Sequence, residues 1–459
     1  MRHIIVNMVT VKIEDLSNEG AGIGRLPSGK CCFVEGALPG ETVEAAIVKD
    51  SPKFAECILE NVITPSDQRV RPYGAPKIPG AALAHLSYGG QIAYKHKKVR
   101  DCLIRLGKIG AEDVDRVLSP VIPSAETTLY RNHMQYKIEG SIIGQTGSDG
   151  VSIIPYEEDF LEYPVFGKIV KAVEACLDRC PTKLLTGLVL RGSLRTGEVL
   201  AEFITCDTRS HETVIRQMQD LIKSAGIIEA IRDAAEGYEL RGVLFRISPD
   251  RISGRTRSGK RFVLEGESFY EEEFCSRRFI VEAGSFFQVN IPQAEAIVNI
   301  IREYVSGSKT LVDLYCGAGT LGLSVMDEGT RLLGIETSQE AVNSAVRNAK
   351  SAYQEDQDRI KFIKKDAAKT DLAGMIRSGQ IPAPDAVIVD PPRKGLGEPV
   401  IAQIKMLGAP KLVYVSCDPA TLARDLKMLR SDYTIDKVQP VDMFPMTYHI
   451  ENVVLMSKR

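Results

Sequence analysis

One stretch of this chain, an apolar strand that runs directly into a glycine turn and a helix, constrains the fold more than any other. It is TLVDLYCGAGTLGLSVM, residues 310–326, with Gly317 and Gly319 in the turn. The next apolar strand, RLLGIE, ends in Glu336, nineteen positions after Gly317. The N–H groups of such a turn face a ligand, and an acid about 20 residues further on can accept hydrogen bonds from a ribose diol. The order predicts a doubly wound α/β sheet with a nucleoside-containing cofactor at the carboxyl ends of its strands.

The same order suits both NAD and S-adenosylmethionine, and a later motif separates the two. The apolar run AVIVD leads into DPPR, residues 390–393, which places the Asp390 carboxylate and two rigid prolines at a strand end beside the cofactor. A dehydrogenase does not need a carboxylate and two rigid prolines at this position, whereas a pocket in which a planar base is methylated does. We therefore expect S-adenosylmethionine.

The 459-residue length suggests about three domains, at roughly 150 residues each. Residues 1–66 contain short strand-like runs that predict an OB-like barrel, and their Gly-rich stretch LSNEGAGIGRLPSGK is interpreted as a hairpin. Residues 67–286 mix helical and strand patterns and predict a central α+β domain. Residues 287–459 alternate strand and helix and predict the Rossmann-like sheet. The expected fold class is multidomain α/β.

A helix is predicted at residues 88–110, where apolar side chains recur at near-helical spacing. The basic residues between them, Lys95 included, are assigned to a separate basic side of this helix.

A second basic segment lies between residues 241 and 261, with seven basic side chains and one acid, Asp250, on a chain of net charge −2. Most basic runs are solvated faces, but one this one-sided also suits contact with phosphates. Its basic residues are Arg241, Arg246, Arg251, Arg255, Arg257, Lys260 and Arg261.

The cysteine spacing and the hydrophobic pattern argue against several classes of protein. The ten cysteines are scattered without a C-x-x-C pair, which argues against a disulfide framework and a zinc ribbon. No run approaches the ~18 apolar residues of a membrane-spanning helix, and the start of the chain has no signal-peptide core. We expect a cytoplasmic protein without a membrane partner.

Five motifs, in order, resemble the RNA uracil-5-methyltransferase family. They are FFQVN (286–290), DLYCGAGT (313–320), DPPRKG (390–395), SCDP (416–419) and HIE (449–451). Near the N-terminus, EGAGIGR, FVEGALPGE and PSDQRV resemble the TRAM domain, an OB-like RNA-binding barrel. The resemblance spans essentially the whole chain and implies a class I methyltransferase sheet at its C-terminal end.

The resemblance also implies roles for particular residues. Cys417 would be the nucleophile that adds to carbon 6 of uracil, and Glu451 would be the general base that removes the proton from carbon 5. His449 is expected to be positioning or structural. The residues that would contact S-adenosylmethionine or line its pocket are Gln288, Tyr315, Gly317, Thr320, Glu336, Asp366 and Asp390.

The implied substrate is a uridine in structured RNA. The TRAM-like barrel favours 23S ribosomal RNA, because it resembles the rRNA-modifying branch of the family, and transfer RNA is the runner-up. A stacked target base must be extruded to reach the pocket. No obligate protein partner is evident.

Many family members carry an iron-sulfur cluster on cysteines in a C-x5-C-x2-C pattern after the TRAM domain. Aligning LAHL, residues 83–86, with the segment that follows that pattern puts Pro72, Ile78 and Ala81 at the cysteine positions. The fourth position, near Asp159, is not a cysteine either. Because such a cluster is held by thiolates, we expect no iron-sulfur cluster and no other metal.

Two alternatives remain open. One is an RNA-binding or folding factor in which the methyltransferase fold only senses the cofactor. The other is an amino-group methyltransferase, against which Arg393, in place of the aromatic residue of its Asp-Pro-Pro-aromatic motif, and Cys417 both count.

Overall fold

The computed structural model describes residues 7–71, 80–147, 152–157, 161–180, 182–206, 211–248, 259–353 and 357–459. The chain forms two compact units, each described by itself below. Unit 1 consists of Met1–Ala125, Cys417–Lys427 and Val438–Asn452, and unit 2 of Glu126–Ser416, Met428–Lys437 and Val453–Arg459. The three-domain division with boundaries at 66 and 286 stays a prediction.

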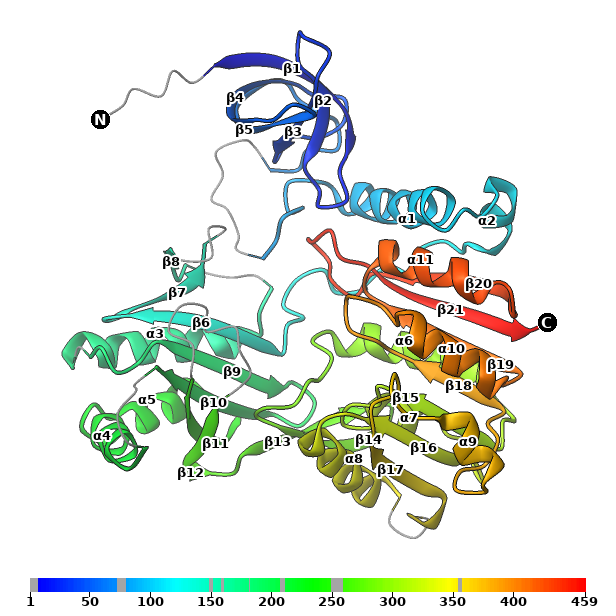
Figure 1. Ribbon diagram of the computed structural model, residues 1–459. Helices are drawn as coiled ribbons and strands as arrows, with labels where there is room; N and C mark the ends of the chain where they lie inside the picture. The colour runs from blue at the N-terminus through cyan, green and yellow to red at the C-terminus, as the bar shows by residue number, and fades with distance from the viewer. Residues whose placement is uncertain are drawn as a thin grey trace. The chain divides into compact units, whose positions relative to one another are not determined.

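Unit 1 begins with a closed five-stranded barrel of order β1-β2-β3-β5-β4, drawn in blue in Figure 1. Alternate side chains of its strands point inward and form a small apolar core that includes Val11, Val34 and Val43. The expected OB-like barrel is confirmed. The strands are β1 Met8–Leu16, β2 Gly22–Arg25, β3 Cys31–Glu35, β4 Thr42–Asp50 and β5 Phe54–Thr64.

The glycine-rich stretch forms the turn from β1 to β2 and the β2–β3 hairpin, as predicted. A Cβ atom at Gly24 would lie 2.4 Å from a methyl carbon of Val11 and 2.6 Å from the carbonyl oxygen of Lys12. Only glycine therefore allows β2 to approach β1 this closely.

Three helices lie wholly or mostly in unit 1, and the predicted helix at 88–110 is confirmed in its first eighteen residues. Ser87 caps it by accepting a hydrogen bond of 3.1 Å from the N–H of Gly90. The assignment of Lys95 to a separate basic side of this helix is wrong, because Lys95 is fully buried among the residues of its packed face. The helices are α1 Tyr88–Arg105, α2 Ala111–Val117 and α11 Pro419–Leu429.

Unit 2 contains a first seven-stranded sheet of order β12-β11-β10-β9-β6-β7-β8. Helices α3, α4 and α5 pack on one face of it and share its apolar core (Figure 1). The strands are β6 His133–Glu139, β7 Ile142–Thr146, β8 Ile153–Pro155, β9 Gly187–Ser193, β10 Glu198–Thr205, β11 Glu239–Ile247 and β12 Lys260–Gly266, and the helices are α3 Pro164–Arg179, α4 His211–Ser224 and α5 Ile227–Ala234.

The predicted basic segment at 241–261 belongs to this sheet at both of its ends. Arg246 of β11 and Arg261 of β12 both pair with the buried carboxylate of Glu202, at 3.4 and 2.6 Å. These two arginines are therefore already neutralised in part by a carboxylate of the sheet. The remaining stretch, 249–258, which contains Arg251, Arg255 and Arg257, lies outside the described residues.

A second seven-stranded sheet has the order β17-β16-β15-β18-β19-β21-β20. The strands from β17 to β19 are parallel neighbours, as expected for a doubly wound sheet. Its elements are α6 Ile291–Val305, β15 Thr310–Leu314, α7 Thr320–Val325, β16 Arg331–Glu336, α8 Gln339–Ala352, η1 Gln357–Arg359, β17 Ile360–Lys364, α9 Leu372–Arg377, β18 Ala386–Val389, α10 Glu398–Leu407, β19 Lys411–Ser416, β20 Tyr433–Val441 and β21 Glu451–Lys458.

This strand order creates a topological switch point. The chain proceeds from β15 to β16 and β17 on one side and then crosses to β18 on the other side of β15. At such a point the connections leave in opposite directions, and ligands bind at the carboxyl ends of the strands.

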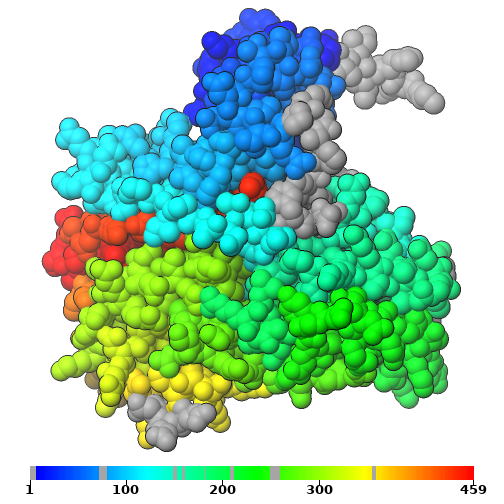
Figure 2. Space-filling model, turned by 180° about the vertical axis from the view of Figure 1, so that it is seen from behind, coloured from blue at the N-terminus to red at the C-terminus, as the bar shows by residue number. Residues whose placement is uncertain are grey.

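A hairpin of β13 Phe269–Phe274 and β14 Arg277–Glu282 precedes α6. In the space-filling view, the green to yellow segments of unit 2 form one continuous surface (Figure 2).

Two expectations from the sequence concern a metal site and a membrane-spanning helix. Among the described residues, no group of three or more His, Cys, Asp and Glu side chains is placed to hold a metal ion. Of the aligned cluster positions, Ala81 is buried, whereas Pro72, Ile78 and Asp159 lie outside the described residues. Within the described ranges, no helix is both long and apolar enough to cross a membrane.

Candidate cofactor and catalytic sites

The turn after β15 is held in a conformation that most residues avoid. Tyr315, Gly317 and Gly319 have φ angles of 70°, 54° and 78°. A Cβ atom at Gly319 would lie 2.9 Å from the ring of Phe362 and 3.2 Å from the Cβ atom of Ala345. Glycine is therefore needed at this position for both its backbone angle and its lack of a side chain.

Glu336 ends β16 and reaches back to this turn. Its Oε2 accepts a hydrogen bond of 3.2 Å from the N–H of Gly317. Its Oε1 accepts bonds of 2.6 and 2.9 Å from the N–H groups of Thr337 and Ser338. The carboxylate is thus fixed at the carboxyl edge of the sheet, and the structure brings Gly317 and Glu336 together.

Two further acids lie at the same edge. Asp313 of β15 is 1% exposed and accepts a hydrogen bond of 3.1 Å from the N–H of Gly322. Burial, together with the charges of Asp390 and Glu336, raises the pKa of Asp313 to about 8. Burial likewise raises the pKa of Asp390, the residue after β18, to about 7. A cationic ligand would stabilise the ionised forms of these carboxyl groups.

The structure also locates three other residues that were predicted to contact the cofactor. Thr320 is the first residue of α7. Asp366 follows β17, and its side chain accepts a hydrogen bond of 2.9 Å from the N–H of Ala368. Gln288 lies between β14 and α6, and its carbonyl oxygen accepts a hydrogen bond of 2.9 Å from the side chain of Asn132.

Asn132 and Asn348 are functional candidates that the sequence did not reveal. The Nδ2 atom of Asn348, on α8, donates to the carbonyl of Ala318 in the glycine turn at 3.0 Å, and its Oδ1 accepts from the N–H of Ile280 at 2.8 Å. Both asparagines are buried. Their signal in the sequence is weak, because an asparagine in a polar stretch usually indicates a solvated position or a cap.

Cys316, in the glycine turn, is a packing residue. It is buried, and burial followed by the charge of Asp313 raises the pKa of its thiol. A thiol held neutral in this way is a poor nucleophile.

Cys417 belongs to unit 1 and directly follows β19, partly buried. The next residue, Asp418, caps α11 by accepting hydrogen bonds of 2.9 and 2.8 Å from the N–H groups of Ala420 and Thr421. The thiol therefore stands on a turn fixed by a strand on one side and a capped helix on the other.

Glu451 also belongs to unit 1 and is the first residue of β21. It is only 7% exposed, so it is not a solvated acid at a sheet edge. His449, two residues earlier, packs against aromatic rings, with ring centroids 4.4 Å from Tyr448 and 6.0 Å from Phe444. A buried carboxylate is suited to act as a general base for removal of a proton from carbon.

A sheet of this strand order, with a glycine turn after its central strand and acids at its carboxyl edge, defines a class I methyltransferase, and the barrel adds a module of the OB type. The profile of the tRNA (uracil-5-)-methyltransferase family matches residues 250–459, and that of the TRAM domain matches residues 5–59.

Relatives match along the whole length. An uncharacterized RNA methyltransferase of Caldanaerobacter subterraneus subsp. tengcongensis is 31% identical over 98% of this chain and 97% of its own. One of Clostridium tetani is 33% identical over 97% and 95%. The crystal structure of a Pyrococcus abyssi tRNA (uracil-54, C5)-methyltransferase in complex with S-adenosyl-L-homocysteine has a TM-score of 0.72 at 24% identity, covering 97% of this chain and 99% of that one, which shows the same fold.

This chain belongs to the RNA uracil-5-methyltransferase family. The resemblance seen in its motifs is thereby confirmed, and so are the class of enzyme and its dependence on S-adenosylmethionine.

Proposed function

We propose that this protein methylates carbon 5 of a uridine in 23S ribosomal RNA through a covalent adduct on Cys417. Two observations within unit 1 support this most directly: Cys417 lies on a turn whose next residue caps α11, and the carboxylate of Glu451 is buried. An amino-group methyltransferase would need neither.

The cofactor would be held at the carboxyl edge of the second seven-stranded sheet. S-adenosylmethionine, when bound, supplies the methyl group on a positively charged sulfur. Glu336 would accept hydrogen bonds from its ribose, as acids at this position of a doubly wound sheet do. Asp390 would offer negative charge, and the carboxyl groups whose pKa values are raised suit a cationic ligand. The other residues proposed to line the pocket are Gln288, Tyr315, Gly317, Thr320 and Asp366.

The proposed role of Cys417 is to make carbon 5 of uracil reactive toward the methyl group. Carbon 5 of uracil is a poor nucleophile, but addition of the Cys417 thiolate to carbon 6 places an enolate across carbon 5, which can then take the methyl group. Glu451 next removes the proton from carbon 5. The electrons of that C–H bond re-form the double bond as the C6–S bond breaks, and the thiolate is regenerated.

The RNA would be held by the TRAM barrel together with the central domain. A target uridine in a folded RNA is stacked and has to be extruded before Cys417 can reach carbon 6. The barrel favours ribosomal RNA, because its motifs resemble the branch of the family that modifies ribosomal RNA. Transfer RNA is the second candidate, because the enzyme from Pyrococcus abyssi that shares this fold is named for uridine 54 of tRNA.

Two other predictions accompany this function. We propose domain boundaries at residues 66 and 286, so that residues 67–286 form a separate RNA-binding domain. We also propose a cytoplasmic location, because none of the ten cysteines, all within the described residues, is in a disulfide.

The test uses RNA transcribed with 5-fluorouridine. Fluorine cannot leave as a cation, so Glu451 cannot complete the elimination and the adduct persists. Native protein, Cys417→Ala and the matched control Cys180→Ala, which alters a partly exposed thiol at the end of α3, are incubated with S-adenosylmethionine and 23S or transfer RNA. Denaturing electrophoresis and peptide mapping then locate any adduct.

We expect native protein and Cys180→Ala to form a cofactor-dependent adduct with 23S RNA on Cys417. Cys417→Ala should form no adduct. An adduct with transfer RNA alone would overturn the ribosomal target. No adduct with either RNA, despite cofactor binding, would favour the RNA-binding factor that only senses the cofactor.

A further inference from the structure

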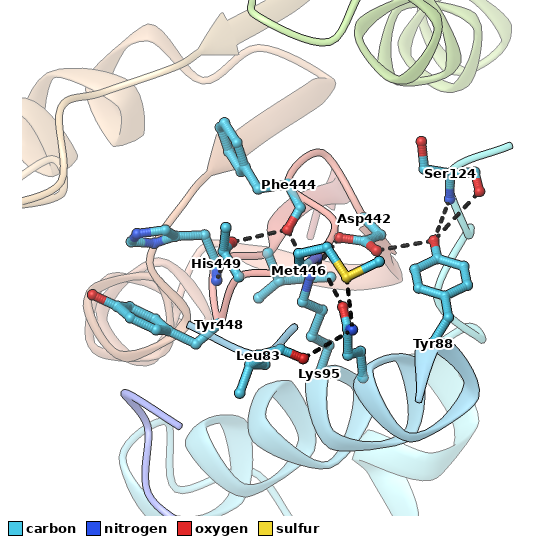
Figure 3. A network of polar contacts seen from close by, with 12 residues as sticks. Leu83, Tyr88, Lys95, Ser124, Asp442, Phe444, Met446, Tyr448 and His449 are labelled. Atoms are coloured by element: carbon cyan, nitrogen blue, oxygen red, sulfur yellow. Dashed lines mark hydrogen bonds and ion pairs between the residues drawn. The ribbon is translucent and has the colours of Figure 1, made fainter. Parts of the chain in front are cut away.

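Helix α1 carries a row of polar side chains on the face that a globular protein normally makes apolar. Tyr88, Gln91, Lys95 and Lys98 follow one another at helical spacing, and Gln91 and Lys95 are completely buried. Figure 3 shows Tyr88 and Lys95 directed from α1 toward the segment from Asp442 to His449, which joins β20 to β21. All of these residues belong to unit 1.

Lys95 and Asp442 form the centre of this network. The Nζ atom of Lys95 lies 2.5 Å from Oδ1 of Asp442, both side chains are 0% exposed, and the same Nζ donates to the carbonyl of Phe444 at 3.0 Å. The hydroxyl of Tyr88 donates to Oδ2 of Asp442 at 3.0 Å and accepts from the N–H of Ser124 at 2.7 Å. Both oxygens of the Asp442 carboxylate are thus engaged by α1.

The neighbours of Lys95 on α1 hold the rest of the segment. The amide of Gln91 accepts a hydrogen bond of 2.8 Å from the N–H of Met446, a non-glycine residue with a φ of 65°. Lys98 donates to the carbonyl of Tyr448 at 2.9 Å and to the carbonyl of Asn18, in the barrel, at 2.6 Å. A backbone in so sparsely populated a conformation persists only where its surroundings hold it, and α1 supplies that hold.

We propose that Lys95 is a positioning residue for proton removal: its ion pair with Asp442 fixes the segment that leads into Glu451. The proposal rests on the proposed function, in which Glu451 is the base. An apolar pair of similar volume would usually stabilise a protein interior at least as well as a buried ion pair, so stability alone does not explain these two residues. Their contacts converge on the segment that ends two residues before Glu451.

The proposal predicts which step fails when Lys95 is replaced. Addition of Cys417 to carbon 6 and methylation of carbon 5 precede the action of Glu451. If Glu451 is out of place, carbon 5 keeps both its proton and its new methyl group, and the C6–S bond does not break. A variant at Lys95 should therefore accumulate a covalent adduct with ordinary uridine-containing RNA, which a generally damaged protein cannot form.

The experiment compares full-length Lys95→Met and Asp442→Asn with native protein, with Glu451→Gln as the reference for a blocked base. The matched control is Lys97→Met, two residues along α1, whose lysine is 51% exposed and pairs with Asp15 at 2.7 Å. Each protein is given S-adenosylmethionine and uridine RNA, and the steady-state rate and the adduct that survives denaturation are measured.

Lys95→Met and Asp442→Asn should lower kcat by about tenfold or more, change KM for RNA by less than about threefold and retain an adduct, as Glu451→Gln does. Lys97→Met should match native protein, and Lys95→Arg should recover part of kcat. If Lys95→Met fails to fold, Asp442→Asn, which keeps the shape of the side chain, decides the question.

Adduct in Glu451→Gln alone, or loss of folding in both network variants, would overturn the proposal, because the pair would then serve stability only. Failure of the proposed function itself would look different: Glu451→Gln would retain no adduct, and native protein would form none with 5-fluorouridine RNA.

Discussion

The N–H of Gly317 donates a hydrogen bond of 3.2 Å to the carboxylate of Glu336, nineteen residues further along the chain. This bond joins the ends of two neighbouring parallel strands, β15 and β16, at the edge where a doubly wound sheet binds its ligand. It fixes the orientation of the carboxylate at this edge.

Replacing Glu336 should weaken cofactor binding without unfolding the protein. Glu336→Gln loses the charged acceptor for the ribose hydroxyls, and a charge-assisted hydrogen bond of this kind contributes about 1.5–3 kcal/mol. Titration calorimetry with S-adenosylhomocysteine should show a Kd raised by about tenfold or more. Glu328→Gln, which alters an exposed acid just before β16, is the control, and an unchanged Kd in Glu336→Gln would refute this role for Glu336.

Without cofactor, the protein should lose stability as the pH rises. Burial and neighbouring charges raise the pKa of Asp313 to about 8 in the folded protein, whereas the group ionises near 3.8 when unfolded. The folded state therefore binds more protons than the unfolded state between about pH 4 and pH 8, and the free energy of unfolding falls across that window.

Thermal unfolding between pH 5 and 8.5 measures this dependence. Asp313→Asn cannot ionise, so its unfolding temperature should fall less with pH than that of the native protein. Glu328→Gln should keep the native slope. Equal slopes in Asp313→Asn and native protein would show that Asp313 does not carry the effect.

The buried ion pair between Arg69 and Glu41 should contribute much more to the free energy of unfolding than an exposed ion pair of the barrel. Arg69 binds the fully buried carboxylate of Glu41 through Nε at 2.6 Å and Nη2 at 2.8 Å. Arg69→Leu leaves that charge unpaired and should lower the free energy of unfolding by about 3–5 kcal/mol.

The comparison is with Lys49→Met, which breaks the exposed pair between Lys49 and Glu56 and should cost about 0–1 kcal/mol. Urea denaturation gives both values. Similar losses in the two variants would contradict the difference in burial on which the prediction depends.

Asn348→Ala should weaken the support of the glycine turn. It removes the hydrogen bonds to Ala318 and Ile280, and two partly buried backbone groups lose their partner, at about 1 kcal/mol each. We expect a lower unfolding midpoint and weaker binding of S-adenosylhomocysteine by calorimetry. Asn343→Ala, an exposed change on the same helix, should alter neither, and native affinity in Asn348→Ala would mean that the turn holds its shape unaided.

The order of elements was largely available from the sequence. The apolar strand before Gly317, the acid nineteen residues later and the cysteine after the run KLVYVS are local patterns, and each lies where it was expected. Glycine at 319 could be recognised because a turn with positive φ leaves a signature in residue type. The barrel was equally readable from its short strands and turns.

The burial of polar side chains could not be read in this way. Lys95 lies among basic residues and looks solvated in the sequence, yet its partner Asp442 is 347 positions away. Asn348 is similar, because Ala318 and Ile280 come from a loop and a hairpin that precede its helix.

The sequence by itself determined the class of fold, the family and the residues proposed for chemistry, because periodicity, turn residues and motifs are properties of neighbouring positions. Only the tertiary structure decided that Glu451 is buried, that Glu336 is fixed by Gly317 and that α1 holds the segment before Glu451. The physical reason is that the free energy of a buried polar group depends on partners brought to it by the fold, and a one-dimensional pattern does not contain their positions.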